Sequence, residues 1–285
     1  MKRLLRGIGI ALGGLFALAI VAYSIVYLLS ERTLRHSYAF SAVAISIPTD
    51  AASISEGQRL ATVRGCFTGC HGRQAEGVMF FDQPMIARLV APNLTAAVRK
   101  YSDSELAVII RNGLRPDGTS MLVMPSETFA VLTDADLGRV IAFLRSLPAM
   151  TGPGPSLTLG PIGRIGLAVG QFKMAARLIA EAHPPPDGVT PEAARGRYLA
   201  QTVCSECHGT DLHGMSNPDF TSPDLRTVAA YQPGDFEKLM RVGVAIGGRN
   251  DLLTMGPWAR QNLSHLTDGE IADLYAYLHA VPDAG

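Results

Sequence analysis

The four cysteines of this 285-residue chain all lie in two short segments, and each segment ends in Cys-His. The second segment, Cys204–His208, has the pattern C-x-x-C-H. The first, Cys66–His71, has one additional residue between its cysteines and reads C-x-x-x-C-H. Such spacing is typical of covalent attachment or metal binding, so these segments constrain the fold more strongly than the overall composition does.

C-x-x-C-H is the attachment signature of c-type haem, in which two thiols add to the vinyl groups and the adjacent histidine binds the iron. We therefore expect two covalent haems c, one per segment. In the first segment, Gly69 could adopt a positive φ and let the additional residue bulge out. The expected attachment and iron-binding residues are Cys66, Cys70, His71, Cys204, Cys207 and His208.

Other interpretations of the cysteines remain open. Two cysteine pairs can bind zinc, although the spacer here is much longer than in the usual zinc motifs and each pair has its own histidine. A disulfide within each pair is compatible with an oxidising compartment. In the first segment, a single thioether through Cys70 is an alternative to bonds through both thiols.

Residues Gly7–Leu29 form an uncharged stretch of 23 residues rich in Leu, Ile, Ala and Val. As a helix, this stretch would cross a bilayer core of about 30 Å. Because Lys2, Arg3 and Arg6 precede it, the positive-inside rule predicts a single-pass inner-membrane protein whose remaining residues are periplasmic. A cleaved signal peptide is the alternative, but its apolar region is usually only about 7–15 residues long.

The rest of the sequence contains a pseudo-repeat, in which the same motifs follow one another in the same order. The pairs are Gly57-x-x-Leu60 and Gly196-x-x-Leu199, Pro92-Asn93-Leu94 and Pro223-Asp224-Leu225, Arg111-x-Gly113 and Arg241-x-Gly243, and Met124-Pro125 and Met255-Gly256-Pro257. Each unit closes with a helix that begins at a Thr-Asp cap and ends before a proline. No run of alternating apolar residues predicts a sheet, so we expect an all-α protein.

We divide the chain into a transmembrane anchor (1–30), a linker (31–53), a first unit (54–150), an interdomain segment (151–189) and a second unit (190–285). In the interdomain segment, apolar residues recur every three or four positions from Ile162 to Ile179, which predicts an amphipathic helix. Two placements are open. The helix packs across both units, or it lies on the membrane surface with its basic residues toward lipid phosphates.

Each unit resembles a class I cytochrome c domain in its Cys-His segment, proline motif, methionine loop and closing helix. The whole chain is similar to membrane-anchored dihaem cytochromes c, including cytochrome subunits of periplasmic membrane-bound dehydrogenases and, more distantly, cytochromes of the c4 type. The resemblance implies that the first and last helices of a unit cross near a glycine and an aromatic residue. The matching residues are Gly57 with Phe143, and Gly196 with Tyr275 or Tyr277.

The resemblance also implies the remaining haem-binding residues. The carbonyls of Pro92 and Pro223 would each accept a hydrogen bond from the iron-binding histidine. A methionine thioether would bind the iron on the other side, and the motif points to Met124 and Met255. Met121 remains a rival to Met124, because it lies 12 residues before the threonine cap of the closing helix, as Met255 does.

Arg111 and Arg241 occupy equivalent positions of the repeat. They would either pair with haem propionates, since guanidinium binds carboxylates bidentately, or remain solvated charges at helix ends. Charge also distinguishes the units, because residues 54–150 include 10 basic and 9 acidic residues, whereas residues 190–285 include 7 and 12. The acidic second unit is suited to docking a basic protein. Nothing in the pattern indicates nucleic-acid binding.

Two haems with histidine and methionine ligands would leave no iron position for a substrate, so we expect an electron-transfer protein and not an enzyme. The donor would be a dehydrogenase subunit or a quinol-oxidising complex of the cytochrome bc1 type, and the acceptor a terminal oxidase. The anchor would keep the carrier beside these membrane partners. The alternative is a dihaem peroxidase, which needs one open haem with acid–base groups beside it.

Overall fold

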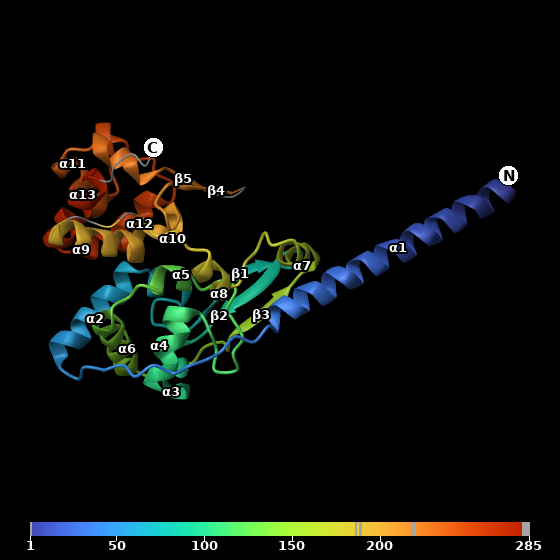
Figure 1. Cartoon of the computed structure of the whole chain (residues 1–285), viewed down its shortest axis with the longest axis horizontal. Helices are drawn as coiled ribbons and strands as arrows, with labels where there is room; N and C mark the ends of the chain where they lie inside the picture. The colour runs from blue at the N-terminus through green and yellow to red at the C-terminus, as the bar shows by residue number, and fades with distance from the viewer. Residues whose placement is uncertain (1, 186, 188–189, 218–219, 281–285) are drawn as a thin grey trace.

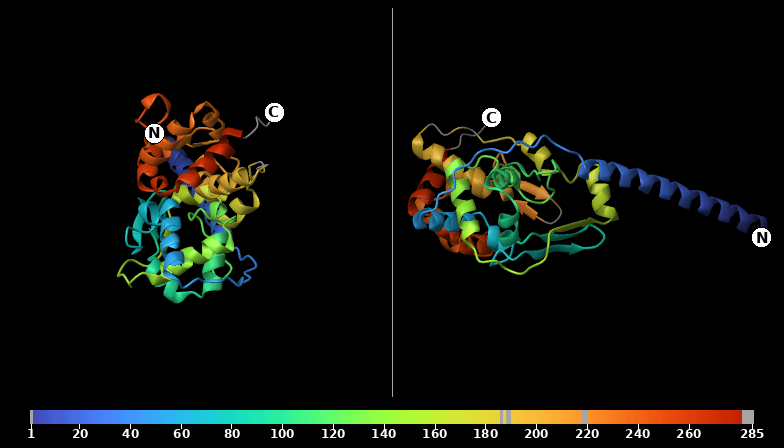
Figure 2. Two further views of the ribbon diagram at one scale, coloured as in Figure 1. Left: turned by 90° about the vertical axis from the view of Figure 1, so that its left-hand side faces the viewer. Right: turned by 90° about the horizontal axis from the view of Figure 1, so that it is seen from below.

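The computed structural model describes residues 2–185, 187, 190–217 and 220–280. Its first element, α1 (Lys2–Leu34), is a long helix that projects from one end of a two-lobed body (Figure 1 and Figure 2). The apolar side chains of α1 are exposed along most of its length. Within the described residues, α1 is the one helix long and apolar enough to cross a membrane.

Both lobes of the body are mainly helical, and each corresponds to one unit of the repeat (Figure 1). The first unit contains α2 (Ala51–Val63), α3 (Leu94–Lys100), α4 (Asp103–Asn112), α5 (Ser126–Phe129) and α6 (Asp134–Ser146). The second contains α9 (Pro191–Leu199), α10 (Ser205–His208), α11 (Pro233–Val242), α12 (Met255–Gln261), α13 (Asp268–Ala280) and short 3₁₀ turns at Leu225–Ala230, Ile246–Gly248 and Leu263–His265. The predicted helical fold, with an apolar N-terminal helix before two similar units, is confirmed.

The helix ends coincide with the capping residues. At the start of α4, the Ser102 hydroxyl accepts a hydrogen bond from the Glu105 N–H at 3.3 Å, and the Glu105 carboxylate accepts one from the Ser102 N–H at 2.8 Å. Thr267 and Glu270 form the same reciprocal pair before α13, at 3.1 and 2.8 Å. Gly113 ends α4 with a φ of 61°, a left-handed conformation that glycine adopts without steric cost.

In each unit the first and last helices cross at a glycine, α2 with α6 and α9 with α13. A Cβ atom at either Gly57 or Gly196 would lie 2.0 Å from a backbone oxygen of the opposite helix. Phe143 is the aromatic neighbour of the first glycine, with its Cβ 3.0 Å from the added atom. At Gly196 the aromatic neighbour is Tyr277, and not Tyr275, with its Cβ 2.6 Å from the added atom. The crossing expected from the resemblance is therefore present in both units.

Two small antiparallel sheets accompany the helices, and the sequence did not predict them. One has the order β1 (Val78–Gln83), β2 (Ala87–Ala91) and β3 (Ser156–Leu159), and the other pairs β4 (Met215–Asn217) with β5 (Phe220–Ser222). All five strands are short. β1 is at least partly exposed along both faces, so no apolar alternation marks it, and β3 reaches β2 from the distant interdomain segment.

The interdomain segment also differs from the single helix that its periodicity predicts. It forms α7 (Pro161–Ala168) and α8 (Ala175–Ala180), which are separated at Gly170, where a φ of 77° breaks the helix. α7 packs against α1, and α8 packs against α4 and α5. A small apolar cluster joins the segment to the base of α1 and to the first unit, and its members are Leu34, Ala87, Leu122, Leu157, Leu159, Leu167 and Met174. The segment thus fixes the first unit to α1.

Candidate haem-binding site

The first cysteine segment forms one turn of π-helix, Cys66–Cys70, closed by a hydrogen bond from the His71 N–H to the Cys66 carbonyl at 3.1 Å. A π-turn contains one more residue than an α-turn, so it accommodates the additional residue of C-x-x-x-C-H. The glycine with positive φ is Gly65, at 71°, directly before the turn, and not Gly69, for which the sequence predicted it. Both thiols therefore belong to a single turn.

The second segment reaches the same arrangement differently, through a π-turn, Ala200–Cys204, followed by α10, which ends at His208. Beyond the histidines, the two units follow the same backbone course. The His71 carbonyl accepts a hydrogen bond from the Gly77 N–H, and the His208 carbonyl accepts one from the Gly214 N–H, both at 2.8 Å. The residues with positive φ also correspond, and they are Gly72, Ala75 and Gly77 in the first unit and Gly209, Leu212 and Gly214 in the second.

Each histidine ring is oriented by a carbonyl of the proline motif. His71 Nδ1 lies 2.9 Å from the Pro92 oxygen, and His208 Nδ1 lies 2.8 Å from the Pro223 oxygen. Because a carbonyl only accepts hydrogen bonds, Nδ1 carries the proton and Nε2 keeps a free lone pair for a metal. Burial lowers the pKa of both imidazoles, and the hydrogen bond to the proline carbonyl partly opposes this shift.

All four thiols are free, and no disulfide joins either pair. Burial raises the pKa of the first cysteine of each pair to about 12 and that of the second to about 11. Zinc takes thiolates, and the described residues contain no group of three or more His, Cys, Asp or Glu side chains that could hold a metal ion. Paired neutral thiols beside an oriented imidazole fit covalent haem c better than zinc or a disulfide.

The methionines expected to bind the iron both come before the closing helices, Met124 in a loop and Met255 at the first residue of α12. Met124 precedes α5 and packs against the core of the first unit, and Met255 begins α12 and packs against the core of the second. Met121 is held by its backbone, since its N–H donates to the Gly113 carbonyl at 2.7 Å and its carbonyl accepts from the Ala175 N–H at 2.8 Å. The backbone of Met121 therefore lies at the junction with α8, and Met124 as the ligand stays a prediction.

Arg111 and Arg241 have a role that the sequence did not indicate. Arg111 donates to the Leu132 carbonyl at 2.6 Å and pairs with Asp134 at 2.8 Å, at the start of α6. Arg241 makes the equivalent contacts with backbone carbonyls and a carboxylate at the start of α13. Both guanidinium groups therefore hold two helices of their own unit together and are not solvated charges at helix ends. Their contact with haem propionates stays a prediction.

The two units meet at their attachment segments. Trp258, which follows Met255, lies against the first segment, where a Cβ atom at Gly65 would be 2.1 Å from the indole. In the opposite direction, α5 of the first unit contacts the turn Ala200–Cys204 of the second. In each unit, the residues that follow the expected methionine ligand thus pack against the attachment segment of the other unit.

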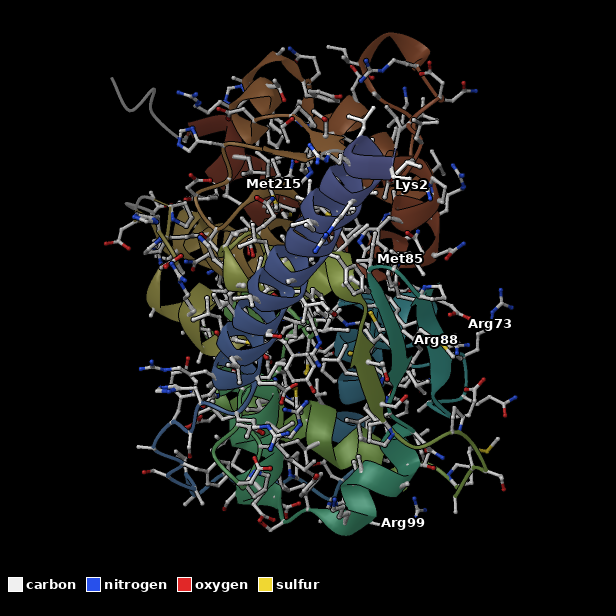
Figure 3. The ribbon with its side chains drawn as sticks, turned by 90° about the vertical axis from the view of Figure 1, so that its right-hand side faces the viewer. Lys2, Arg73, Met85, Arg88, Arg99 and Met215 are labelled. Atoms are coloured by element: carbon white, nitrogen blue, oxygen red, sulfur yellow. The ribbon has the colours of Figure 1, made fainter. Side chains whose placement is uncertain are left out.

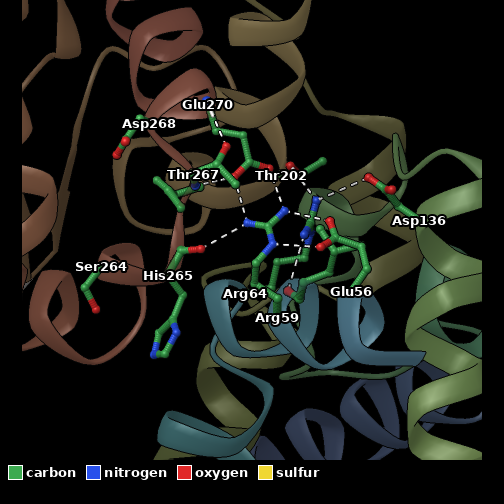
Figure 4. A network of polar contacts seen from close by, with 12 residues as sticks. Glu56, Arg59, Arg64, Asp136, Thr202, Ser264, His265, Thr267, Asp268 and Glu270 are labelled. Atoms are coloured by element: carbon green, nitrogen blue, oxygen red, sulfur yellow. Dashed lines mark hydrogen bonds and ion pairs between the residues drawn. The ribbon is translucent and has the colours of Figure 1, made fainter. Parts of the chain in front are cut away.

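A polar network links the units at the same interface (Figure 4). Arg59 of α2 donates to both carboxylate oxygens of Glu270, at the start of α13, at 2.7 and 2.8 Å. At the equivalent position of the second unit, Tyr198 of α9 donates to Asp136, at the start of α6, at 2.6 Å. The interface is therefore pseudo-symmetric, with the first helix of each unit contacting the last helix of the other. Sequence reasoning missed these residues because their partners lie in different units.

Replacing Arg59 by methionine should destabilise the chain by about 1–3 kcal/mol, because Glu270 would stay partly buried without its cation. The control is Arg88→Met, since the Arg88–Asp82 ion pair is exposed and should contribute less than about 1 kcal/mol. Chemical unfolding followed by circular dichroism measures both losses. Equal losses in the two variants would contradict a stabilising role for Arg59 at the interface.

Similarity to known proteins agrees with this geometry. The family model for cytochrome c matches residues 54–148 and again residues 193–282. The fructose dehydrogenase cytochrome subunit of Gluconobacter japonicus is 25% identical over 261 residues, which cover 81% of this chain and 53% of that subunit. The chain thus spans about half the length of this relative. Because the family matches include both attachment segments, the chain belongs to the cytochrome c family, whose members transfer electrons through covalently bound haem c.

Proposed function

We propose that this chain is a membrane-anchored dihaem cytochrome c, with one haem in each of the units 54–150 and 190–285. Residues 1–30 anchor it in the inner membrane, and both units are periplasmic. The observation that carries the proposal is the repetition, in both units, of free paired thiols beside a histidine whose Nδ1 is held by a proline carbonyl. The exposed apolar helix α1 supports the anchor.

The chain receives electrons from a periplasmic dehydrogenase or a quinol-oxidising complex and passes them to a terminal acceptor such as an oxidase. The name of the relative, a cytochrome subunit of a fructose dehydrogenase, supports a dehydrogenase as the donor. The second unit has 12 acidic and 7 basic residues, so its charge would steer a basic protein toward it.

The side chains of each unit have separate tasks. The paired thiols would hold the porphyrin, and the histidine Nε2 would bind the iron, while the proline carbonyl orients the imidazole ring and increases its basicity. Met124 and Met255 would each supply a thioether, a soft ligand that favours the reduced metal. Haem would supply the one-electron chemistry. With a histidine and a methionine as protein ligands, the iron would have no position left for a substrate.

The interface supports transfer between the units. Arg59 and Tyr198 fix the first helix of each unit against the other unit, and Trp258 packs on the first attachment segment. Because both attachment segments lie at this contact, the two haems would keep a constant separation. A constant separation suits a carrier that moves electrons internally before it passes them on.

Replacing Met255 or Met124 by alanine should allow one haem to bind carbon monoxide and should lower one potential by roughly 0.1 V or more, because a soft ligand is lost. Met121→Ala is the matched control and should change neither property. Redox titration and carbon monoxide difference spectra of the purified protein measure both. The ligand assignment is wrong if Met121→Ala has this effect and Met124→Ala does not. Carbon monoxide binding by the unmodified protein would favour a peroxidase instead.

A further inference from the structure

α7 is apolar around most of its circumference, although it lies on the surface of the body. It contains one charged residue, Arg164. Gly163 and Leu167 are buried against the body, whereas Ile162 and Ile165 are 50% and 45% exposed on the outer side, and Val169, directly after the helix, is 73% exposed. A helix with apolar residues on all sides is normally covered on all sides. The outer side of α7 therefore lacks a cover within the described part of the chain.

The single charge of α7 is directed at α1. The Arg164 guanidinium donates to the Ser30 hydroxyl and to the Glu31 carboxylate, both at 2.9 Å, and lies 3.9 Å from the centre of the Tyr27 ring. These contacts hold α7 beside the part of α1 where the uncharged stretch Gly7–Leu29 ends. If α1 crosses a membrane, this is the level of its outer surface.

The turn between β1 and β2 lies beside the start of α7. The Ile162 N–H donates to the Met85 carbonyl at 2.9 Å, and the Met85 side chain is 57% exposed. Figure 1 and Figure 2 show α7 and this hairpin at the end of the body from which α1 leaves. Figure 3 looks onto that end and labels Met85. The exposed apolar residues of the hairpin and of α7 thus lie around the base of α1.

We propose that α7 and the β1–β2 turn dip into the membrane surface, so that Met85, Ile162, Ile165 and Val169 lie at the boundary between lipid headgroups and acyl chains. This inference rests on the proposed crossing of the membrane by α1. Apolar side chains of interfacial elements commonly reach about 5–10 Å into this boundary. Arg32, exposed on the last turn of α1, and Arg35, exposed directly after the helix, would then lie among the lipid phosphates.

Such insertion would determine how the haem units face the membrane. With α1 alone, the body could rotate about one helix. With α7 and the hairpin also embedded, the first unit is held at several points, and the second is fixed to it through the interface of Arg59 and Glu270. The docking surfaces for redox partners would then have a constant orientation relative to the membrane.

Photo-labelling of the full-length holoprotein in liposomes tests this inference. The liposomes contain phosphatidylcholine, phosphatidylglycerol and a phospholipid with a diazirine near the start of one acyl chain, and labelled peptides are identified by mass spectrometry. We expect labels in α1, in 161–172 and in 84–86. Leu253, 94% exposed in the segment of the second unit between α11 and α12, should stay unlabelled.

A double variant, Ile165→Glu with Val169→Glu, should reduce labelling of 161–172 at least fivefold, by rough estimate, since charged side chains leave the acyl boundary. Label in α1 and the haem spectrum should stay unchanged. Val242→Glu, an exposed apolar position at the end of α11, is the matched control and should leave all labels unchanged.

The outcomes separate the two proposals. Label in α1 with none in 161–172 or 84–86 would overturn the insertion of α7 and leave the anchor in place. Absence of label from α1 as well would overturn the anchor and the insertion together. Label at Leu253 equal to that of α7 would show that exposed apolar residues react without insertion, and would also overturn the inference. Because the unmodified protein gives these results, the test does not depend on the folding of a variant.

Discussion

Replacing Cys204 and Cys207 together by serine should reduce the covalently bound haem of the purified chain from two per polypeptide to one. A serine hydroxyl does not add to the vinyl group as a thiol does, so His208 would be left with no covalently held haem to bind. The first unit keeps its own thiols and its own histidine. Its haem should therefore remain and should survive denaturation. Pyridine haemochrome absorbance per polypeptide, measured after extraction with acidic acetone, gives the ratio.

The corresponding single changes in the first segment test whether both of its thiols are bonded. Cys66 and Cys70 belong to one π-turn, so we expect a thioether at each. Cys66→Ser should leave the haem attached through Cys70 alone, with one vinyl group still conjugated to the ring. The haemochrome absorption of that haem should then move to longer wavelength. An unchanged spectrum would show that Cys70 already carries the only bond in the unmodified protein.

The haem count itself can be contradicted in two ways. If the unmodified chain contains one haem per polypeptide, only one unit binds haem, and the double serine variant shows which unit that is. If the double serine variant still retains two covalent haems, the second segment is not an attachment site. Metal analysis by mass spectrometry is the control. Zinc bound to the protein would favour a zinc site at the cysteines, an interpretation that the free, neutral thiols disfavour.

Features encoded by residues close in sequence could be predicted. The threonine cap of α13 needs only residues three apart, and this helix begins where the sequence predicts it. The capping box of Ser102 and Glu105 is equally local. The hydrogen bond between His71 and Pro92 is not local, but the family resemblance predicts it. In the structure, His71 Nδ1 lies 2.9 Å from the Pro92 oxygen. Local motifs and a known arrangement of motifs thus accounted for most of the candidate site.

What could not be predicted depends on contacts between distant segments. The partners of Arg111 are a carbonyl and a carboxylate more than twenty residues away, so its sequence context suggested a propionate contact or a charge at a helix end but not this bridge. Gly65, where the positive φ falls, also has no room for a Cβ atom because Trp258 of the other unit packs against it, and no pattern within the first unit reveals this contact. Strand β3 forms only because the chain returns to β2 after the whole first unit.

The helix crossings should be the most sensitive positions outside the haem sites. Replacing Gly196 by valine should destabilise the second unit by about 3 kcal/mol or more, because the new Cβ would meet a backbone oxygen of α13 at 2.0 Å. Neither a rotamer change nor the movement of a flexible side chain relieves a clash with backbone. α9 and α13 must therefore separate, and their separation opens the core that surrounds the attachment segment.

Gly234→Ala is the matched control for this substitution. Gly234 lies in the first turn of α11, and an added Cβ there would meet nothing within 4 Å. Alanine has a higher helix propensity than glycine, so this variant should be neutral or more stable by up to about 1 kcal/mol. Chemical unfolding followed by circular dichroism and by haem absorbance compares the two variants with the unmodified protein. If Gly196→Val and Gly234→Ala unfold at the same denaturant concentration, the close crossing of α9 and α13 does not hold the second unit together. If only Gly196→Val unfolds early, glycine at the crossing is what allows two helices of one unit to come close enough to enclose its haem.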